Sequence, residues 1–223
     1  MKRTSVSLAA MAAVLAFAGA ASAQTVATAT TDLNVRSGPG PQYPVIGLIQ
    51  AGQSAELNGC LEGSKWCRAI VNGGDGWVYS DYLTSQFSGT ATVVTTRPSG
   101  SVPVVTYEQP SGGAGAVAGA TTGAVAGALI AGPIGAVAGG VAGAAIGGTA
   151  EGIASPPPAE VRTYIEANRP EPVYLDGEVV VGASLPQDVR LVEVPNYEYR
   201  YVYVNGVPVL VEPETRRIVY VVR

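Results

Sequence analysis

The reactive residues of this chain limit the chemistry that it can perform. The sequence has 223 residues, with two cysteines and no histidine. Without histidine, it cannot build a Ser-His-Asp or Cys-His nucleophile or a histidine metal site. Two cysteines cannot by themselves close a four-ligand zinc site. We therefore expect no catalytic residues, no metal, no cofactor and no enzyme activity.

The two cysteines, Cys60 and Cys67, flank a short loop, Leu61–Trp66. In an oxidising compartment, an isolated pair of this kind predicts a structural disulfide. The alternative is a redox-active pair. The spacing disfavours that alternative, because it is not C-x-x-C.

The N-terminus predicts export. Lys2 and Arg3 precede an apolar stretch, Leu8–Ala20, and Ala21-Ser22-Ala23 has the A-x-A pattern of a cleavage site. Residues 1–23 are therefore predicted to be a signal peptide that is cut after Ala23. The alternative, a retained membrane anchor, would need a longer apolar stretch. We expect a protein of the periplasm or cell envelope.

The formal net charge of the chain is -4, which argues against a nucleic-acid partner. Differences in composition divide the rest of the chain into segments. We expect a mainly β protein with two small folded units, each near the lower size limit for an independent core. The expected segments are a folded unit at 25–84, a Ser/Thr/Pro linker at 85–111, a Gly/Ala-rich segment at 112–150 and a second folded unit at 159–223.

The first unit reads as a set of short strands separated by glycine and proline, which is typical of a small barrel or sandwich. The expected strands are Thr25–Thr30, Val45–Ile49, Ser54–Cys60, Trp66–Val71 and Gly76–Tyr79. The expected core residues are Leu33, Val35, Val45, Ile46, Trp77, Val78 and Leu83. Gly38 and Gly40 flank Pro39, and we expect them to adopt positive φ in a tight turn.

Two motifs bracket this unit. Leu33–Gly40 reads L-N-V-R-S-G-P-G, and Gly76–Leu83 reads G-W-V-Y-S-D-Y-L. They resemble the two ends of the bacterial SH3-like family. The resemblance implies a small SH3-like barrel that binds a cell-wall or envelope peptide in an aromatic groove. The candidate ligand-binding residues are Arg36, Tyr43, Trp66, Tyr79 and Tyr82.

Each of these candidates also has a structural interpretation. The aromatic side chains could instead pack inside the barrel, and for Trp66 and Tyr82 the sequence does not decide between the two roles. For Arg36, a structural hydrogen bond at the turn is favoured over contact with a ligand carboxylate.

The Gly/Ala-rich segment, Gly112–Ala150, has a regular period. Small residues recur every four positions from Gly115 to Gly147, which places them on one helical stripe where helix backbones can approach closely. This resembles the glycine-zipper segments of bacterial envelope proteins, which implies a helical hairpin, divided near Pro133, that associates with a membrane or drives homo-oligomers. The alternative is a flexible linker, because glycine costs about 1 kcal/mol per helical position in water.

The second unit reads as one short helix followed by strands. The helix is predicted from Val161, Tyr164, Ile165 and Asn168, which fall at helical spacing. Hairpins are predicted around Asp176-Gly177 and Asn205-Gly206, with a last strand at Arg217–Val222. Tyr197, Tyr199, Tyr201 and Tyr203 alternate along one strand face. That face is either an aromatic binding stripe or a structural face that covers the helix or forms the core of the sheet.

The end of this unit resembles the domain of unknown function number 1236 of secreted bacterial proteins. The shared residues include Tyr203–Gly206, Leu210–Pro213 and Thr215–Val219. That resemblance implies a location and a fold but no activity.

Together these features predict a secreted, non-enzymatic cell-envelope protein whose SH3-like unit binds peptidoglycan or an envelope peptide. The alternative is a structural component that assembles or associates with a membrane through its glycine-rich segment. A wall hydrolase is disfavoured because no Cys-His pair exists.

Overall fold

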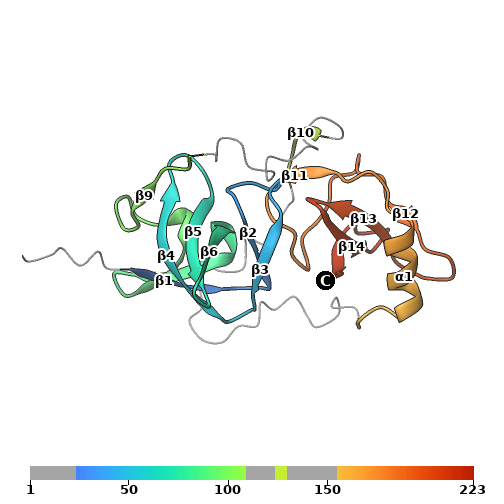
Figure 1. Cartoon of the computed structure of the whole chain (residues 1–223), viewed down its shortest axis with the longest axis horizontal. Coiled ribbons are helices and arrows are strands. Elements are labelled where there is room, and N and C mark those ends of the chain that lie inside the picture. The colour runs from blue at the N-terminus through green and yellow to red at the C-terminus, as the bar shows by residue number, and fades with distance from the viewer. Residues whose placement is uncertain (1–23, 109–123, 130–154) are drawn as a thin grey trace, which may run out of the picture.

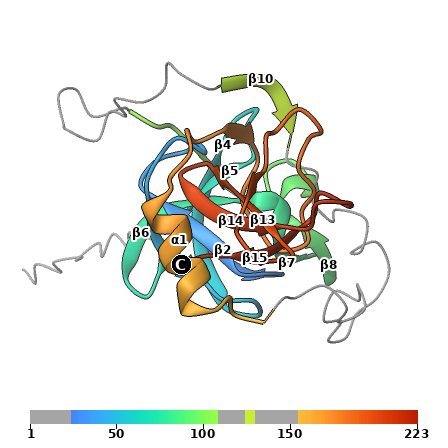
Figure 2. The same cartoon turned by 90° about the vertical axis from the view of Figure 1, so that its right-hand side faces the viewer.

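The computed structural model describes residues 24–108, 124–129 and 155–223. Within these ranges the chain forms two β units that lie side by side (Figure 1). In Figure 2 the C-terminal unit lies in front of the N-terminal one. The signal peptide predicted at residues 1–23 lies outside the described residues.

The N-terminal unit is a nine-stranded sheet whose strand order is β3-β2-β6-β5-β4-β1-β7-β8, with β9 paired to β4. All of the pairs are antiparallel except β4 with β9. The strands are β1 Thr25–Ala29, β2 Leu33–Arg36, β3 Val45–Ile49, β4 Ser54–Leu61, β5 Trp66–Val71, β6 Gly74–Tyr79, β7 Leu83–Phe87, β8 Thr90–Val93 and β9 Val104–Val105. Two 3₁₀ turns, η1 Ser80–Tyr82 and η2 Val94–Thr96, follow β6 and β8. The five strands predicted from the sequence are confirmed.

The stretch that composition predicts as a linker is largely folded. Strand β7 pairs with β1 on one side and with β8 on the other, and β9 pairs with β4. The linker prediction is therefore wrong for residues 85–105. The serine and threonine residues of this stretch lie in strands. In β7, alternate residues such as Ser85 and Phe87 point inward and are buried.

Strand β3 corrects the predicted core. Leu33, Val35, Trp77, Val78 and Leu83 are buried as expected. However, the side chains of Val45 and Ile46 are 40% and 56% exposed. The reason is that β3 is the terminal strand of the sheet, so its first residues have sheet on one side only.

The turn after β2 uses its glycines for space rather than for backbone freedom. Neither Gly38 nor Gly40 has a positive φ, so that prediction is wrong. A Cβ atom on Gly38 would lie 2.4 Å from the ring of Tyr43, whereas one on Gly40 would meet only the flexible side chain of Gln42. Gly38 is needed because the tyrosine ring packs directly on its backbone.

The C-terminal unit contains one helix and a four-stranded antiparallel sheet with the order β12-β13-β14-β15. The elements are α1 Ala159–Ala167, β12 Val192–Glu193, β13 Arg200–Val204, β14 Val207–Val211 and β15 Ile218–Val221. The helix and the Asn205-Gly206 hairpin are confirmed. Both turn residues have positive φ, 52° and 77°, as the tight turn between right-twisted strands requires.

The hairpin predicted around Asp176-Gly177 does not form. Strand β11 covers only Tyr174–Asp176, and Glu178–Val180 have no regular secondary structure. Glu178 instead accepts a hydrogen bond from Arg36 of the N-terminal unit. The next two residues, Val179 and Val180, are fully buried. The sequence motif marks a sharp change of direction at Gly177, where φ is 112°, rather than a hairpin.

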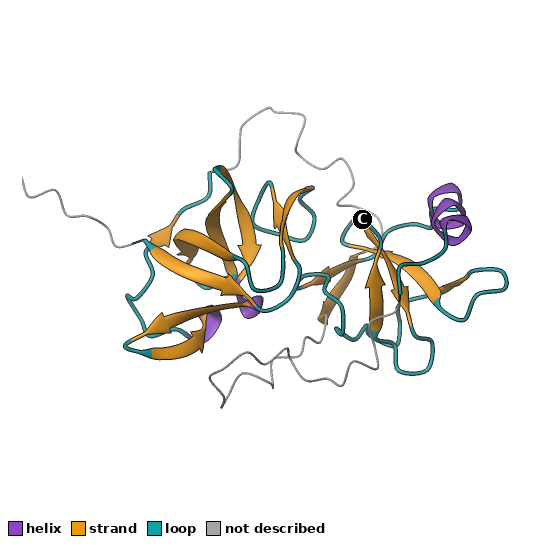
Figure 3. Ribbon diagram, turned by 90° about the horizontal axis from the view of Figure 1, so that it is seen from below, coloured by secondary structure: helices purple, strands orange, loops and turns teal. Residues whose placement is uncertain are grey.

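Both faces of the C-terminal sheet are buried. Helix α1 covers one face, where the hydroxyls of Tyr201 and Tyr203 donate hydrogen bonds to the carbonyls of Asn168 (2.5 Å) and Ile165 (3.3 Å). Tyr201 and Tyr203 therefore lie on the face that the helix covers, whereas Tyr197 and Tyr199 precede β13 and are half-buried. The opposite face, with Val202 and Val204, belongs to a buried apolar cluster that continues into the N-terminal unit. Figure 3 shows the helix on the side of this sheet away from the N-terminal unit.

Part of the glycine-rich segment is a strand. Residues Ala124–Leu129 form β10, which pairs in parallel with β11. The helical prediction is wrong for these six residues, because their backbone groups bond to a neighbouring strand instead. The rest of Gly112–Ala150 lies outside the described residues. Among the described helices, none has the length and apolar character to span a bilayer.

Candidate functional site

Three of the predicted ligand-binding residues form one aromatic cluster, which consists of Trp66, Tyr79 and Tyr82. Trp66 and Tyr79 lie opposite each other on β5 and β6, with ring centroids 5.3 Å apart and ring planes at 69°. The ring of Tyr82, in η1, lies 6.1 Å from that of Tyr79. The three side chains are only 6%, 9% and 5% exposed. Their rings therefore pack within the protein, and only their outer atoms reach the surface.

Two charged residues stand at the rim of this cluster. Lys65 Nζ lies 2.8 Å from Asp81 Oδ2 and 5.7 Å from the centre of the Tyr79 ring. The hydrogen bond to Asp81 raises the pKa of Lys65. Asp81 also accepts a hydrogen bond of 2.6 Å from Thr95 Oγ1. Thr95 belongs to the segment predicted as a linker, so this segment helps to position Asp81 at the edge of the cluster. Sequence reasoning missed Lys65 and Asp81, although each adjoins a predicted aromatic residue.

The environment of the cluster raises the pKa of both of its tyrosines. Burial is the main cause that raises the pKa of Tyr79 and of Tyr82, and the charge of Asp81 adds to it in both cases. The hydroxyl of Tyr82 has no hydrogen-bond partner within the part of the chain that the structure describes. A tyrosine hydroxyl without an internal partner can donate to or accept from water or a ligand.

Tyr43 belongs to a separate aromatic group. Its ring lies 5.8 Å from that of Tyr107, which in turn lies 5.5 Å from that of Trp77. Tyr43 is partly exposed, and desolvation is the main cause that raises its pKa. The predicted site residues are thus divided between two aromatic groups and the interior. Their role in ligand binding stays a prediction.

Arg36 is the interior member. Its side chain is completely buried, and Nη1 donates to the carbonyls of Pro41 (3.0 Å) and Tyr43 (2.7 Å), which fixes the turn after β2. Nε and Nη2 donate to the carboxylate of Glu178 in the C-terminal unit, at 2.5 and 2.6 Å. The structural role that the sequence favours is present, and the ion pair adds a contact that the sequence could not indicate.

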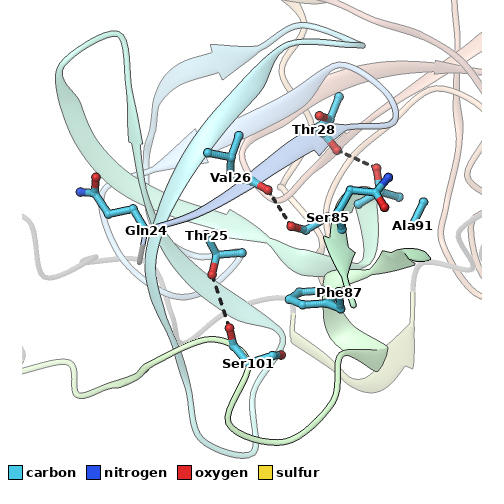
Figure 4. A pocket seen from close by; sticks show the side chains of 10 residues that line it. Gln24, Thr25, Val26, Thr28, Ser85, Phe87, Ala91 and Ser101 are labelled. Atoms are coloured by element: carbon cyan, nitrogen blue, oxygen red, sulfur yellow. Dashed lines mark hydrogen bonds between the residues drawn. The ribbon is translucent and has the colours of Figure 1, made fainter. Parts of the chain in front are cut away.

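A hollow elsewhere on the N-terminal unit was not predicted. It has a volume of about 570 Å³ and is formed by residues of β1, β7 and β8 (Figure 4). Two of its hydroxyls are used internally: Ser85 Oγ donates to Val26 O (2.6 Å) and Thr25 Oγ1 to Ser101 O (3.4 Å). The lining carries no charge; it consists of Gln24, Thr25, Val26, Thr28, Thr84, Ser85, Gln86, Phe87, Ala91 and Ser101.

The predicted disulfide is present. Cys60 and Cys67 lie directly opposite each other on β4 and β5 and are joined by a disulfide that is fully buried. It fixes the β4–β5 pair immediately beside Trp66, and therefore beside the aromatic cluster. Among the described residues, no group of three or more acidic or cysteine side chains could hold a metal ion.

Comparison with known proteins now assigns both units. Residues 31–84 match the model of the bacterial SH3 domain family. The chain carries a bacterial SH3 domain. Residues 164–223 match a second family, the domain of unknown function DUF1236. The SH3 match begins just before β2 and ends after η1, whereas the sheet of this unit continues through β7, β8 and β9.

A curated relative matches part of the chain. It is the Bacillus subtilis (strain 168) protein named "Putative N-acetylmuramoyl-L-alanine amidase YrvJ", which is 39% identical over 70 residues. The match covers 31% of this chain and 13% of that protein. Bacterial SH3 domains often serve as cell-wall binding modules, and together with the disulfide the SH3 domain indicates an extracytoplasmic protein.

Proposed function

We propose that this chain is a secreted, non-enzymatic protein of the bacterial cell envelope whose SH3 domain binds peptidoglycan or an envelope peptide. The family of the SH3 domain supports this, and so does the relative whose name refers to an amidase of the cell wall. The disulfide fits an exported protein, and residues 1–23 would serve as the cleaved signal that directs it to the periplasm.

The rim of the aromatic cluster is the surface on which this proposal rests. Lys65 presents a 44% exposed cation beside the ring of Tyr79, and the nearly buried Asp81 holds it in place. A peptide carboxylate could bind to the exposed ammonium group of Lys65. Because the rings beneath are packed, they hold these polar groups in place rather than stacking on the ligand.

The absence of histidine from the sequence supports a binding role over catalysis. Wall-cleaving enzymes that use a Cys-His pair or a zinc ion bound by histidines could not be built from this chain. The match spans only 13% of that protein, so its named activity is not carried over to this chain.

The second candidate function is assembly or membrane association through the glycine-rich segment. The observation that favours it is the four-residue period from Gly115 to Gly147. Sedimentation of the full chain, with and without detergent, distinguishes the two: a monomer that remains soluble in aqueous buffer argues against assembly and membrane association alike.

A pulldown on purified peptidoglycan sacculi tests the first candidate. Wild type should be retained, and Lys65→Ala should reduce retention by about tenfold, as loss of a charged contact implies. Arg200→Ala is the matched control, because Arg200 is similarly exposed (42% against 44%) and also forms an ion pair, with Glu193, but lies in the C-terminal unit. Equal retention of both variants would rule out the Lys65 rim, and no retention of wild type would rule out wall binding.

A further inference from the structure

The backbone of the SH3 domain contributes most of the carbonyls that hold the guanidinium of Arg36. Nη1 of Arg36 donates to the carbonyls of Pro41 and Tyr43, in the turn that follows β2, and also to the carbonyl of Asn205 in the C-terminal unit (3.2 Å). This leaves the edge formed by Nε and Nη2 free of SH3 acceptors and directed toward the C-terminal unit, where Glu178 lies. A fixed pair of parallel N–H donors is the geometry that binds a carboxylate through both of its oxygens.

Asn34 completes the site. Its Nδ2 atom donates to Glu178 Oε1 at 3.1 Å, so the SH3 domain supplies three donors to a single carboxylate. Asn34 and Arg36 lie on the same short strand, β2, and both are buried. No other acidic side chain contacts the Arg36 guanidinium among the described residues, so this positive charge depends on Glu178 alone.

The segment that supplies Glu178 has the form of a bound peptide. Glu178–Val180 belong to no helix or strand, yet all three side chains are fully buried. Glu178 lies on the Arg36 edge, while Val179 and Val180 join the apolar cluster shared by the two units. The backbone N–H of Val179 also donates to Glu178 Oε1, at 2.8 Å, which holds the carboxylate in its binding position.

We propose that Arg36 and Asn34 form a carboxylate-binding site of the SH3 domain, and that Glu178 of the DUF1236 domain occupies it as a built-in ligand. The site takes the carboxylate of an extended acidic peptide or of a small organic acid. This inference goes beyond the proposed wall binding and does not depend on it. While Glu178 is tethered, its high effective concentration keeps other carboxylates out.

The full chain with Glu178→Ala opens the site. In this variant, sodium acetate should raise the melting temperature in a dose-dependent manner, and sodium chloride at the same ionic strength should not. Wild type should show no acetate-specific shift, because its site is filled. The double variant Arg36→Met, Glu178→Ala should also show none, because the donor edge is lost.

A labelled peptide with the sequence of residues 174–183 identifies the source of the carboxylate. It should bind the Glu178→Ala variant about tenfold or more tightly than wild type in fluorescence anisotropy. A peptide with glutamine in place of Glu178 should bind no better to the variant than to wild type. Acetate stabilisation without peptide binding would show that the site takes small acids.

Two outcomes overturn the inference. One is a folded Glu178→Ala variant that responds to neither acetate nor the peptide. The other is a variant that binds both peptides equally. If Glu178→Ala does not fold in chloride, recovery of the fold in acetate is itself the supporting result. If it folds in neither salt, the isosteric variant Glu178→Gln replaces it in the peptide experiment. Tighter binding of the glutamate peptide than of the glutamine peptide would then support the inference, and equal affinities would overturn it. None of these experiments uses peptidoglycan sacculi. A failure of the proposed wall binding would therefore be seen separately, in the sacculus pulldown.

Discussion

Arg36 and Glu178 are 142 residues apart in the sequence and form an ion pair that solvent does not reach. The guanidinium comes from the SH3 domain and the carboxylate from DUF1236. Every polar atom of the pair is satisfied, because further donors and carbonyls surround it. The two families therefore meet through a specific polar contact as well as through apolar packing.

Breaking this pair from one side should be costly. Arg36→Met leaves the Glu178 carboxylate buried without a countercharge, and we expect the free energy of unfolding to fall by about 3–5 kcal/mol. The double variant Arg36→Met, Glu178→Leu removes both charges and should lose clearly less than the sum of the two single losses. Urea unfolding of the four proteins measures the coupling. Strictly additive losses would mean that the two side chains do not act as a pair.

The disulfide should stabilise the fold to a moderate extent. Cys60 and Cys67 close a short loop, so their replacement by alanine at both positions should lower the free energy of unfolding by roughly 2–3 kcal/mol. Dithiothreitol provides the control: it should destabilise wild type and leave the double variant unchanged. An unchanged free energy of unfolding in the double variant would contradict the expectation.

Gly76 should tolerate no side chain. A Cβ atom there would lie 2.4 Å from Val35 Cγ1 and 3.1 Å from the carbonyl oxygen of Arg36. We expect Gly76→Ala to cost about 1–3 kcal/mol of stability through overpacking. Gly74→Ala, on the same strand, is the matched control, since its Cβ would meet only Val71 O, at 3.4 Å. Thermal melting of the two variants should show a clear loss for the first and little change for the second.

Tyr82 should make the fold sensitive to alkaline pH. Burial raises the pKa of Tyr82 above the value of 10.0 that it has in the unfolded chain. The unfolded state therefore loses its proton first, so this stabilisation is complete below pH 10 and is lost as the pH rises toward the folded-state pKa. Urea unfolding between pH 8 and pH 11 should show a steeper decline for wild type than for Tyr82→Phe, where this group cannot ionise. Parallel declines would refute the role of Tyr82.

The sequence was sufficient for the local structure. Alternating apolar residues between turns predicted five strands of the first unit, and Asn205-Gly206 predicted its hairpin because both residues accept positive φ. The disulfide also followed from local features. These features depend on neighbours in the chain, which a single sequence displays directly.

The sequence was insufficient to predict the conformation and burial of residues that depend on contacts with distant parts of the chain. Asp176-Gly177 carries the same kind of turn signal, but the next residue, Glu178, bonds to Arg36 instead of forming a second strand. Val45 and Ile46 have core character but fall on the terminal strand of the sheet. The candidate site was affected in the same way: the aromatic residues were identified, whereas the pairing of Lys65 with Asp81 and the partner of Arg36 depend on tertiary contacts.

The C-terminal sheet has a protein layer on each face, and one of those layers is another domain. Either domain expressed without the other would expose a valine-rich surface to water and would leave one charged side chain without its counterpart. The limits of the two families are therefore poor places at which to divide this chain, because its interior continues across them.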